Sequence, residues 1–178
     1  HKEGVLEAAT ALLERLKAMG LRAKMDASDQ SMGWKAAEYE MKGIPLRVEI
    51  GPKDMEKNQC VLVRRDSGDK VFISLDELET AVPATLDAIH DGLYQKAKKN
   101  LEEHIFQANS LEEAKALQAQ HGGFIKTMWC GDEACEIKMK EEGGMTSRCV
   151  PFAQEHLGDT CPICGRAAKK MIYWGVAY

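Results

Sequence analysis

Two short-spaced cysteine pairs, Cys130-x4-Cys135 and Cys161-x2-Cys164, limit the fold of this 178-residue chain more than any other feature. Six cysteines in a chain of this size are too few for a disulfide scaffold, and pairs at this spacing are typical of metal binding inside the cell. Four thiolates suit a closed tetrahedral zinc site with Zn–S distances of about 2.3 Å. The pairs therefore predict a zinc-held module in the last part of the chain.

The second pair, in CPICGR, also fits a redox dithiol, which needs its first cysteine at the N-terminus of a helix. A strand-like run over 167–178 follows the pair instead, and the first pair completes a set of four ligands. Structural zinc is therefore favoured, whereas a catalytic zinc with three ligands would need His156 in place of a cysteine. Cys60 and Cys149 are expected in the core, and the five histidines show no ligand spacing.

The net charge of −4 argues against general nucleic-acid binding, which needs clustered Lys and Arg. A local basic patch is not excluded, because the segment Arg22–Lys70 is slightly basic while the rest of the chain is acidic. No apolar run approaches the length that spans a bilayer, and no signal-peptide pattern opens the chain. We therefore expect a cytoplasmic protein that does not bind membranes.

Hydrophobic periodicity predicts alternating helices and strands up to residue 109. Helices are expected over 5–19 and 34–42, with a long one from about Ser74 to Asn109 that Pro83 bends near its start. Strands are expected over 21–26, 44–50, 59–65 and 70–74, with a loop over 51–58. A further helix should begin at Ser110 and stop at Gly122-Gly123, and short strands should follow from Phe124 onward.

The alternation of helix and strand predicts an α/β unit with a largely parallel sheet. The cysteine-rich tail predicts a second, small metal-held module. We place the first domain at residues 1–108 and the second at residues 109–178.

The strand over 44–50 alternates so that its apolar residues face one way and Arg47 faces the other. Glu40 comes close to the start of this strand, and Lys53 and Asp54 follow its C-terminal end, where open α/β sheets bind ligands. Arginine and lysine donate to guanine O6 and N7, and carboxylates accept from amino groups of bases. Charged strand faces are common, so the pattern alone favours a solvated face with weak ion pairs.

The run GWKAAEYEMKGIPLRVEIGPKDMEKNQCVLVRRDSGDK resembles the anticodon-binding domain of class II prolyl-tRNA synthetases. FIKTMWCGDEACE, RCVPF and CPICGRAAKKMIYWGVAY are similar to the zinc-binding C-terminal domain of their archaeal and eukaryotic-like type. Together the two likenesses cover essentially the whole chain. The resemblance implies an α/β domain with a mixed five-stranded sheet flanked by helices, followed by a small α+β zinc-binding domain.

The same resemblance implies that the first domain reads the two guanines of the proline anticodon UGG in tRNA-Pro. The implied readers are Glu40, Arg47, Lys53 and Asp54, and the implied zinc ligands are Cys130, Cys135, Cys161 and Cys164. The terminal carboxylate of Tyr178 is expected to reach toward the aminoacylation site. The parent enzyme, a homodimer, would join proline to tRNA-Pro with ATP and Mg²⁺. No catalytic residue is expected in this chain, because it contains no ATP-binding motif of class II.

The chain departs from the family pattern at two places. Family members often carry an aromatic residue for base stacking where this chain has Ala36, so Trp34, Tyr39 or another residue is expected to stack. The chain also lacks the strand that normally precedes the first helix, which is expected to leave a gap or an exposed edge in the sheet. The alternative function is a freestanding binding or regulatory module of the same fold, and a CxxC oxidoreductase is less favoured.

Overall fold

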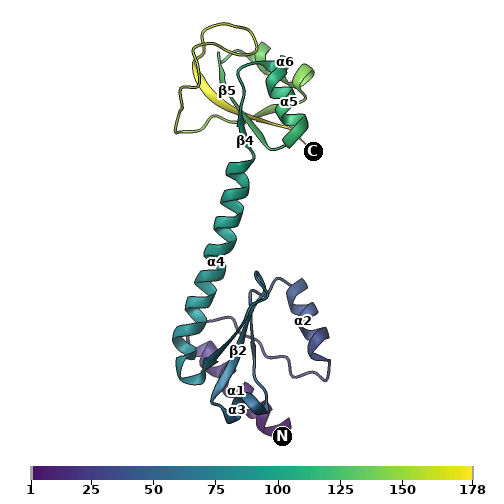
Figure 1. The fold of residues 1–178 in the computed structure, drawn as a ribbon, viewed down its shortest axis with the longest axis vertical. Helices are drawn as coiled ribbons and strands as arrows, with labels where there is room; N and C mark the ends of the chain where they lie inside the picture. The colour runs from purple at the N-terminus through teal and green to yellow at the C-terminus, as the bar shows by residue number, and fades with distance from the viewer. Residues whose placement is uncertain (1, 178) are drawn as a thin grey trace. The chain divides into compact units, whose positions relative to one another are not determined.

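The computed structural model describes residues 2–177, which form two compact units, one up to Gln95 and one from Lys96. We call these the N-terminal unit and the C-terminal unit, and Figure 1 labels some of their helices and strands. The division falls inside a continuous helix, α4 (Leu78–Glu103), so the domain boundary at residues 108–109 stays a prediction. None of the described helices is both long and apolar enough to cross a membrane.

Two helices, α1 (Lys2–Ala18) and the first part of α4, cover the sheet of the N-terminal unit on its apolar face. A short 3-10 turn, η1 (Leu75–Glu77), leads into α4, and the Ser74 hydroxyl caps it by accepting a hydrogen bond from the Asp76 N–H at 3.2 Å. α4 continues through Pro83. The helices predicted over 5–19 and from Ser74 onward are therefore present, with shifted ends.

The N-terminal unit contains one antiparallel sheet, in the order β1-β2-β3. Its strands are β1 (Leu46–Glu49), β2 (Gln59–Arg64) and β3 (Lys70–Ser74). The α/β class is confirmed, but the described residues form three antiparallel strands here. The alternation had predicted a largely parallel sheet, and the family resemblance had implied a mixed sheet of five strands. The connections explain the direction, because a parallel pair needs a crossover of about a dozen residues or more and both links are shorter.

Residues 21–26, predicted as a strand, form no ladder in the structure. Leu21 and Ala23 instead pack their side chains against the core of the N-terminal unit. A strand requires a partner for its backbone N–H and C=O groups, and apolar alternation within the segment does not supply one. This prediction was therefore wrong.

The core of the N-terminal unit lies between the sheet and the helices α1 and α4. Its buried members are Leu12, Leu16, Cys60, Leu62, Leu78 and Val82. Cys60 is fully buried, which confirms its predicted role as a small apolar residue. Cys60 and Leu62 of β2 face this core, so Val61 and Val63 project to the opposite side of the sheet. Their cross-strand neighbours on β1 and β3 lie on that same side.

Two shorter helices flank β1 in sequence. α2 (Met32–Met41) begins at Ser31, whose hydroxyl accepts a hydrogen bond from the Trp34 N–H at 3.2 Å. α3 (Pro52–Glu56) occupies the segment that was predicted as a loop. Proline suits the first helical position, and the Asp54 carboxylate accepts a hydrogen bond from the Gly51 N–H at 3.0 Å, which stabilises the first turn.

The C-terminal unit is built on a mixed sheet in the order β4-β5-β7-β6. β4 (Ile105–Gln107) runs parallel to β5 (Phe124–Trp129), and α5 (Leu111–His121) forms the crossover between them. β7 (Lys170–Gly175) pairs antiparallel with both β5 and β6 (Thr146–Cys149). The predicted start of α5 is confirmed, because Ser110 Oγ accepts a hydrogen bond from the Glu113 N–H at 3.1 Å.

A further helix, α6 (Glu133–Gly143), was not predicted from the sequence. Its sequence is rich in charge, and it buries only Cys135 and Met139. Asp132 caps its first turn by accepting a hydrogen bond from the Ala134 N–H at 2.9 Å. The helix ends at Gly144, which has the left-handed conformation that glycine adopts without strain.

Trp174 forms the centre of the C-terminal core. It is fully buried on β7, and its indole N–H donates to Thr127 Oγ1 on β5 at 2.9 Å. Ile125, Met139 and Ile172 belong to the same core, as do the buried cysteines of this unit. The cysteine pairs therefore lie on the wall of an apolar core.

Candidate metal centre and nucleic-acid interface

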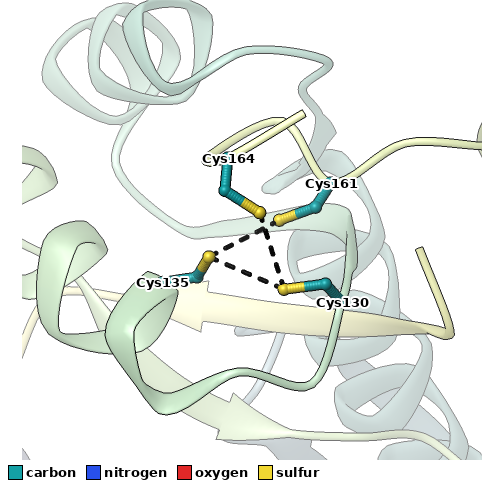
Figure 2. Close-up of side chains that lie close together, drawn as sticks. All are labelled: Cys130, Cys135, Cys161 and Cys164. Carbon is teal, nitrogen blue, oxygen red and sulfur yellow. Dashed lines mark hydrogen bonds between the residues drawn. The ribbon is translucent and has the colours of Figure 1, made fainter. Parts of the chain in front are cut away.

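The four paired cysteines converge in the C-terminal unit (Figure 2). Cys130 directly follows β5, Cys135 lies in the first turns of α6, and Cys161 and Cys164 lie in the turn before β7. Their sulfur atoms all lie within 4.8 Å of one another, and three of the four residues are buried. We call these four residues the cysteine cluster, and its arrangement could hold a metal ion.

The sulfur separations fit a tetrahedral metal site. Cys130 Sγ lies 3.6 Å from Cys135 Sγ and 3.7 Å from Cys164 Sγ, and Cys135 Sγ lies 4.0 Å from Cys161 Sγ. Four sulfurs at 2.3 Å from a central zinc would be about 3.8 Å apart, whereas a disulfide brings its sulfurs to about 2.05 Å. All four are free thiols, so the cluster has the dimensions of a tetrathiolate site.

The turn that carries the second pair is held by its own backbone. The Gly165 N–H donates to the Cys161 carbonyl at 2.8 Å, and the Cys161 N–H donates to the Arg166 carbonyl at 2.8 Å. Gly165 has a φ of 74°, which favours glycine at that position. Figure 2 shows the Cys161 and Cys164 sulfur atoms converging on one centre with those of Cys130 and Cys135.

Arg166 connects the two halves of the cluster. Its Nε donates to Cys164 Sγ at 3.3 Å, and its Nη2 donates to the Asp132 carboxylate at 2.6 Å. Asp132 is the N-cap of α6, the helix that carries Cys135. A single side chain thus contacts one cysteine directly and also contacts the segment between Cys130 and Cys135. Sequence inspection did not single out Arg166, although it directly follows the Cys-x2-Cys-Gly turn.

The pKa of Cys164 is shifted in the opposite direction from those of Cys135 and Cys161. The Arg166 hydrogen bond lowers the pKa of Cys164 to about 6, so this thiol ionises readily. Burial raises the pKa of Cys135 and of Cys161 above the ordinary thiol value. A bound divalent cation would instead favour the thiolate form of Cys135 and Cys161, because thiolates that bind a metal are held deprotonated.

Cys149 is the remaining thiol of the C-terminal unit, and His156 was the alternative metal ligand. Cys149 was expected in the core, and this prediction was wrong, because it is exposed at the end of the edge strand β6. His156 is exposed and lies 3.2 Å from the Asp159 carboxylate. Neither belongs to the group of four thiols that could hold a metal.

Arg47 lies on the face of the N-terminal sheet opposite the core. Its Nε donates to Glu49 Oε1 at 2.7 Å, and its Nη1 donates to Glu40 Oε1 at 3.2 Å. Burial of the guanidinium opposes its charge, but the bonds to Glu49 and Glu40 outweigh burial and raise the pKa of Arg47. The arginine is therefore charged and held in one orientation between α2 and β1.

We call this surface the Arg47 face; it comprises Arg47, Glu49, Val61, Val63, Lys70 and Phe72, which share one side of the sheet through the strand register. A small hollow adjoins it, lined by Tyr39, Glu40, Ile44, Arg47, Val63, Arg64 and Arg65. Three arginines and one glutamate surround this hollow, and two of the arginines, Arg47 and Arg64, are ion-paired with carboxylates. Glu49 was not named as a site residue from the sequence, although its alternation with Arg47 places it on the same face.

The other two predicted readers, Lys53 and Asp54, lie on α3. Lys53 is exposed. Asp54 accepts hydrogen bonds from the Gly51 N–H at 3.0 Å and from Gln59 Nε2 at 3.1 Å, so its carboxylate helps to hold the helix. The structure thus brings Glu40 and Arg47 into direct contact and places the second pair on a separate short helix.

The aromatic residues of α2 have different surroundings. The Tyr39 hydroxyl donates to Asp26 Oδ2 at 3.0 Å, and the Lys42 ammonium lies 5.4 Å from the centre of its ring. Trp34 is about half exposed. Tyr178, the predicted source of a functional carboxylate, lies outside the described residues.

Comparison with known proteins defines the class of each part. Residues 1–85 match the family model "Anticodon binding domain", and residues 111–178 match the family model "Prolyl-tRNA synthetase, C-terminal". The chain belongs to the prolyl-tRNA synthetase family as an anticodon-binding domain followed by the synthetase C-terminal domain. The resemblance read from the sequence is therefore confirmed.

Individual relatives agree with this assignment over the whole chain. It is 55% identical over 178 residues to proline–tRNA ligase 2 of Bacillus thuringiensis (strain Al Hakam). It is 53% identical to proline–tRNA ligase of Clostridium novyi (strain NT) and 56% identical to that of Clostridium botulinum (strain Okra / Type B1). In each case all of this chain is matched, and it spans 37% of the relative's length.

Proposed function

We propose that this chain is the part of a prolyl-tRNA synthetase that recognises the anticodon of tRNA-Pro. The observation that carries the proposal is the Arg47 guanidinium, held between Glu40 and Glu49 on an open face of a domain that matches the anticodon-binding model. An arginine fixed in this way is preorganised for a base edge, because its side-chain entropy is already lost before the RNA binds.

Recognition would use both a hydrogen-bond donor, Arg47, and a hydrogen-bond acceptor, Glu40. The contacts with Glu49 and Glu40 use Nε and Nη1 of Arg47, which leaves Nη2 for the O6 or N7 acceptor of a guanine. Glu40 is about half exposed, and its carboxylate can accept from the amino group of the same base. A guanine offers both an acceptor edge and an amino group, whereas an adenine has no O6 acceptor.

Lys53 and Asp54 complete the proposed set of anticodon readers. Lys53 is exposed and can donate to a base or a phosphate, as a flexible point charge does. Asp54 already accepts hydrogen bonds from Gly51 and Gln59. Its remaining lone pairs would accept a hydrogen bond from a base amino group.

The metal in the cysteine cluster is, in this proposal, a structural zinc ion. Four thiols at tetrahedral separations support zinc, and four protein ligands leave no open coordination position for chemistry. When bound, the ion would cross-link the end of β5, the start of α6 and the turn before β7. Cys130, Cys135, Cys161 and Cys164 would hold it, and Arg166 would orient Cys164.

The activity of the whole protein is part of the same proposal. It would join proline, ATP and tRNA-Pro to give prolyl-tRNA, AMP and pyrophosphate, with ATP, Mg²⁺ and proline bound outside this chain. The proposal keeps the homodimer, the cytoplasmic location and the role of the Tyr178 carboxylate that the family resemblance implies. This chain contributes recognition of the tRNA.

Binding of anticodon variants tests this function. The 178-residue chain is titrated with tRNA-Pro transcripts in which each anticodon guanine is replaced by adenine. Each replacement should weaken binding by about 1–3 kcal/mol, which is roughly fivefold to 150-fold, at a fixed salt concentration. A transcript changed outside the anticodon loop serves as the matched control. Equal affinity for all transcripts would refute anticodon recognition.

A further inference from the structure

Phe72 is an exposed aromatic residue on β3, the edge strand of the N-terminal sheet. Its relative exposure is 63%, which is high for a phenylalanine and leaves most of one ring in contact with water. Phe72 pairs directly with Val61 on β2, and Val61 pairs with Glu49 on β1. Because paired residues share a face, Phe72 belongs to the Arg47 face and not to the core side of the sheet.

Lys70 shows that this face is continuous from β1 to β3. It pairs with Val63, which pairs with Arg47, and its ammonium lies 3.9 Å from Glu49 Oε2 across the central strand. Val61 and Val63 between them are only 6% and 5% exposed. The surface is therefore an apolar floor crossed by charged side chains, with the Phe72 ring at its outer margin.

The composition of this surface points to a ligand that has both a flat apolar face and hydrogen-bonding edges. Arg47 and Lys70 supply donors and positive charge, Glu49 supplies an acceptor, and Phe72 supplies a ring. An unpaired nucleobase joined to a phosphate fits all three, because every base has a π-face and its backbone is anionic. A purely apolar protein segment would leave the charges without partners, at a desolvation cost.

We propose that Phe72 is a stacking platform for one unpaired base of the anticodon loop, next to the base that Arg47 reads. This inference rests on the proposed function and extends it to a residue on a different strand. Phe72 would add affinity that depends little on base identity, whereas Arg47 would add discrimination. The Arg47 face would then hold two neighbouring bases by two kinds of contact.

Two substitutions at Phe72 separate stacking from packing. Phe72→Leu keeps an apolar side chain but removes the ring, and Phe72→Trp keeps a ring. The probe is an RNA stem-loop with the tRNA-Pro anticodon loop, carrying 2-aminopurine at one loop position at a time. We expect Phe72→Leu to weaken binding by about tenfold and Phe72→Trp to bind like the wild type. One loop position should lose fluorescence on binding to the wild type, because stacking quenches the probe, but not on binding to Phe72→Leu.

Val71→Ala is the matched control, since Val71 is half exposed on the same strand but pairs with Leu62 on the core side. It should leave the fluorescence change intact. If Phe72→Leu binds as tightly as the wild type and quenches equally while Arg47→Ala weakens binding, the stacking assignment is wrong and anticodon recognition stands. If the wild type itself does not distinguish the stem-loop from one with a scrambled loop, both proposals are wrong.

A third outcome is that a second copy of the chain, and not RNA, contacts Phe72. If Phe72→Leu leaves RNA binding unchanged but shifts the sedimentation coefficient of the chain, Phe72 packs against a second copy, and the stacking assignment is overturned. Metal content and the thermal unfolding curve of each variant are measured in parallel. Unchanged values show that a loss of RNA affinity does not come from a misfolded chain.

Discussion

The cysteine cluster and the Arg47 face are sites of opposite construction. The cluster consists mostly of buried groups that converge within 4.8 Å, so it encloses the ligand that it fits. The Arg47 face is an open surface on which charged side chains are held by one another at 2.7–3.9 Å. The cysteine cluster would supply every ligand of a bound metal ion, whereas the Arg47 face would need hydrogen-bonding groups from a binding partner.

This difference determines how much each site contributes to folding. A metal that binds only the folded chain adds its binding free energy to the stability of the fold. The Arg47–Glu40 ion pair adds little to stability, because Glu40 is half exposed to water and the desolvation of Arg47 offsets part of the attraction. Substitutions in the cysteine cluster should therefore affect stability, and those on the Arg47 face should affect RNA binding. The following variants test this difference.

The largest effect is expected for Cys135→Ser. Loss of a buried ligand should abolish stable metal binding and lower the stability of the C-terminal unit by more than about 4 kcal/mol. Metal content by mass spectrometry and chemical unfolding followed by circular dichroism measure the two effects. Cys149→Ser is the control, because Cys149 is exposed and outside the cluster. A Cys135→Ser chain that keeps one metal ion would contradict the four-ligand site.

Arg47→Ala should come next, with its main effect on RNA binding. Loss of the Arg47 contact to guanine is expected to cost about 1–3 kcal/mol of binding free energy, measured by titration with tRNA-Pro. Arg47→Lys should recover only a small part, because a lysine cannot present a planar fork. Lys115→Ala in the exposed part of α5 is the charge-matched control. Unchanged affinity in Arg47→Ala would remove Arg47 from the recognition site.

Arg166→Gln should weaken metal retention by about tenfold. Side chains that support metal ligands are typically worth tenfold to 100-fold in affinity, and the partly exposed position of Arg166 favours the lower value. The measurement is the rate of metal transfer to a chromogenic chelator. Lys169→Gln removes a nearby positive charge without the contact to Cys164 and should release metal at the wild-type rate. Equal rates for both variants would show that Arg166 does not support the site.

The smallest effect is expected for the pH dependence that Asp26 contributes. Hydrogen bonds from Ser28, then from Tyr39 and Lys35, hold the pKa of Asp26 far below its ordinary value of 3.8. Because the folded-state pKa is depressed, this stabilisation is present above about pH 4 and is lost as the pH falls toward the folded-state value. Asp26→Asn should therefore lower the stability of the N-terminal unit slightly at neutral pH and less at pH 3.

Hydrogen exchange of amides in the N-terminal unit at the two pH values provides the measurement for Asp26. Asp91→Asn, at an exposed position of α4, is the matched control. A difference between the Asp26 variant and the wild type that grows as the pH falls would reverse the expected sign and contradict the assignment.

Some of these features follow from short stretches of sequence. The spacing of each cysteine pair predicted the metal-binding cluster, because a turn of a few residues already brings two thiols together. The alternation around Arg47 predicted an outward-facing charge, because side chains on a strand alternate between its two faces. The cap at Ser110 and the stop at Gly122 were predicted for the same local reason.

Other features depend on contacts between distant residues. The segment 21–26 has the pattern of a strand but no ladder, because a strand exists only with a neighbour. α6 was missed because its charged sequence shows no clear apolar stripe, and it is held by a cap and two buried residues. Neither outcome could be read from the residues of the segment itself.

By itself, the sequence singled out the candidate site residues: four thiols in two pairs, and an arginine on an alternating strand. Only the tertiary structure decided their surroundings. Arg166 reaches Asp132 across 34 positions of the chain, and the strand register brings Lys70 and Phe72 to the side of Arg47. The physical reason is that local spacing fixes the direction of a side chain, whereas its partners come from segments that only packing brings together.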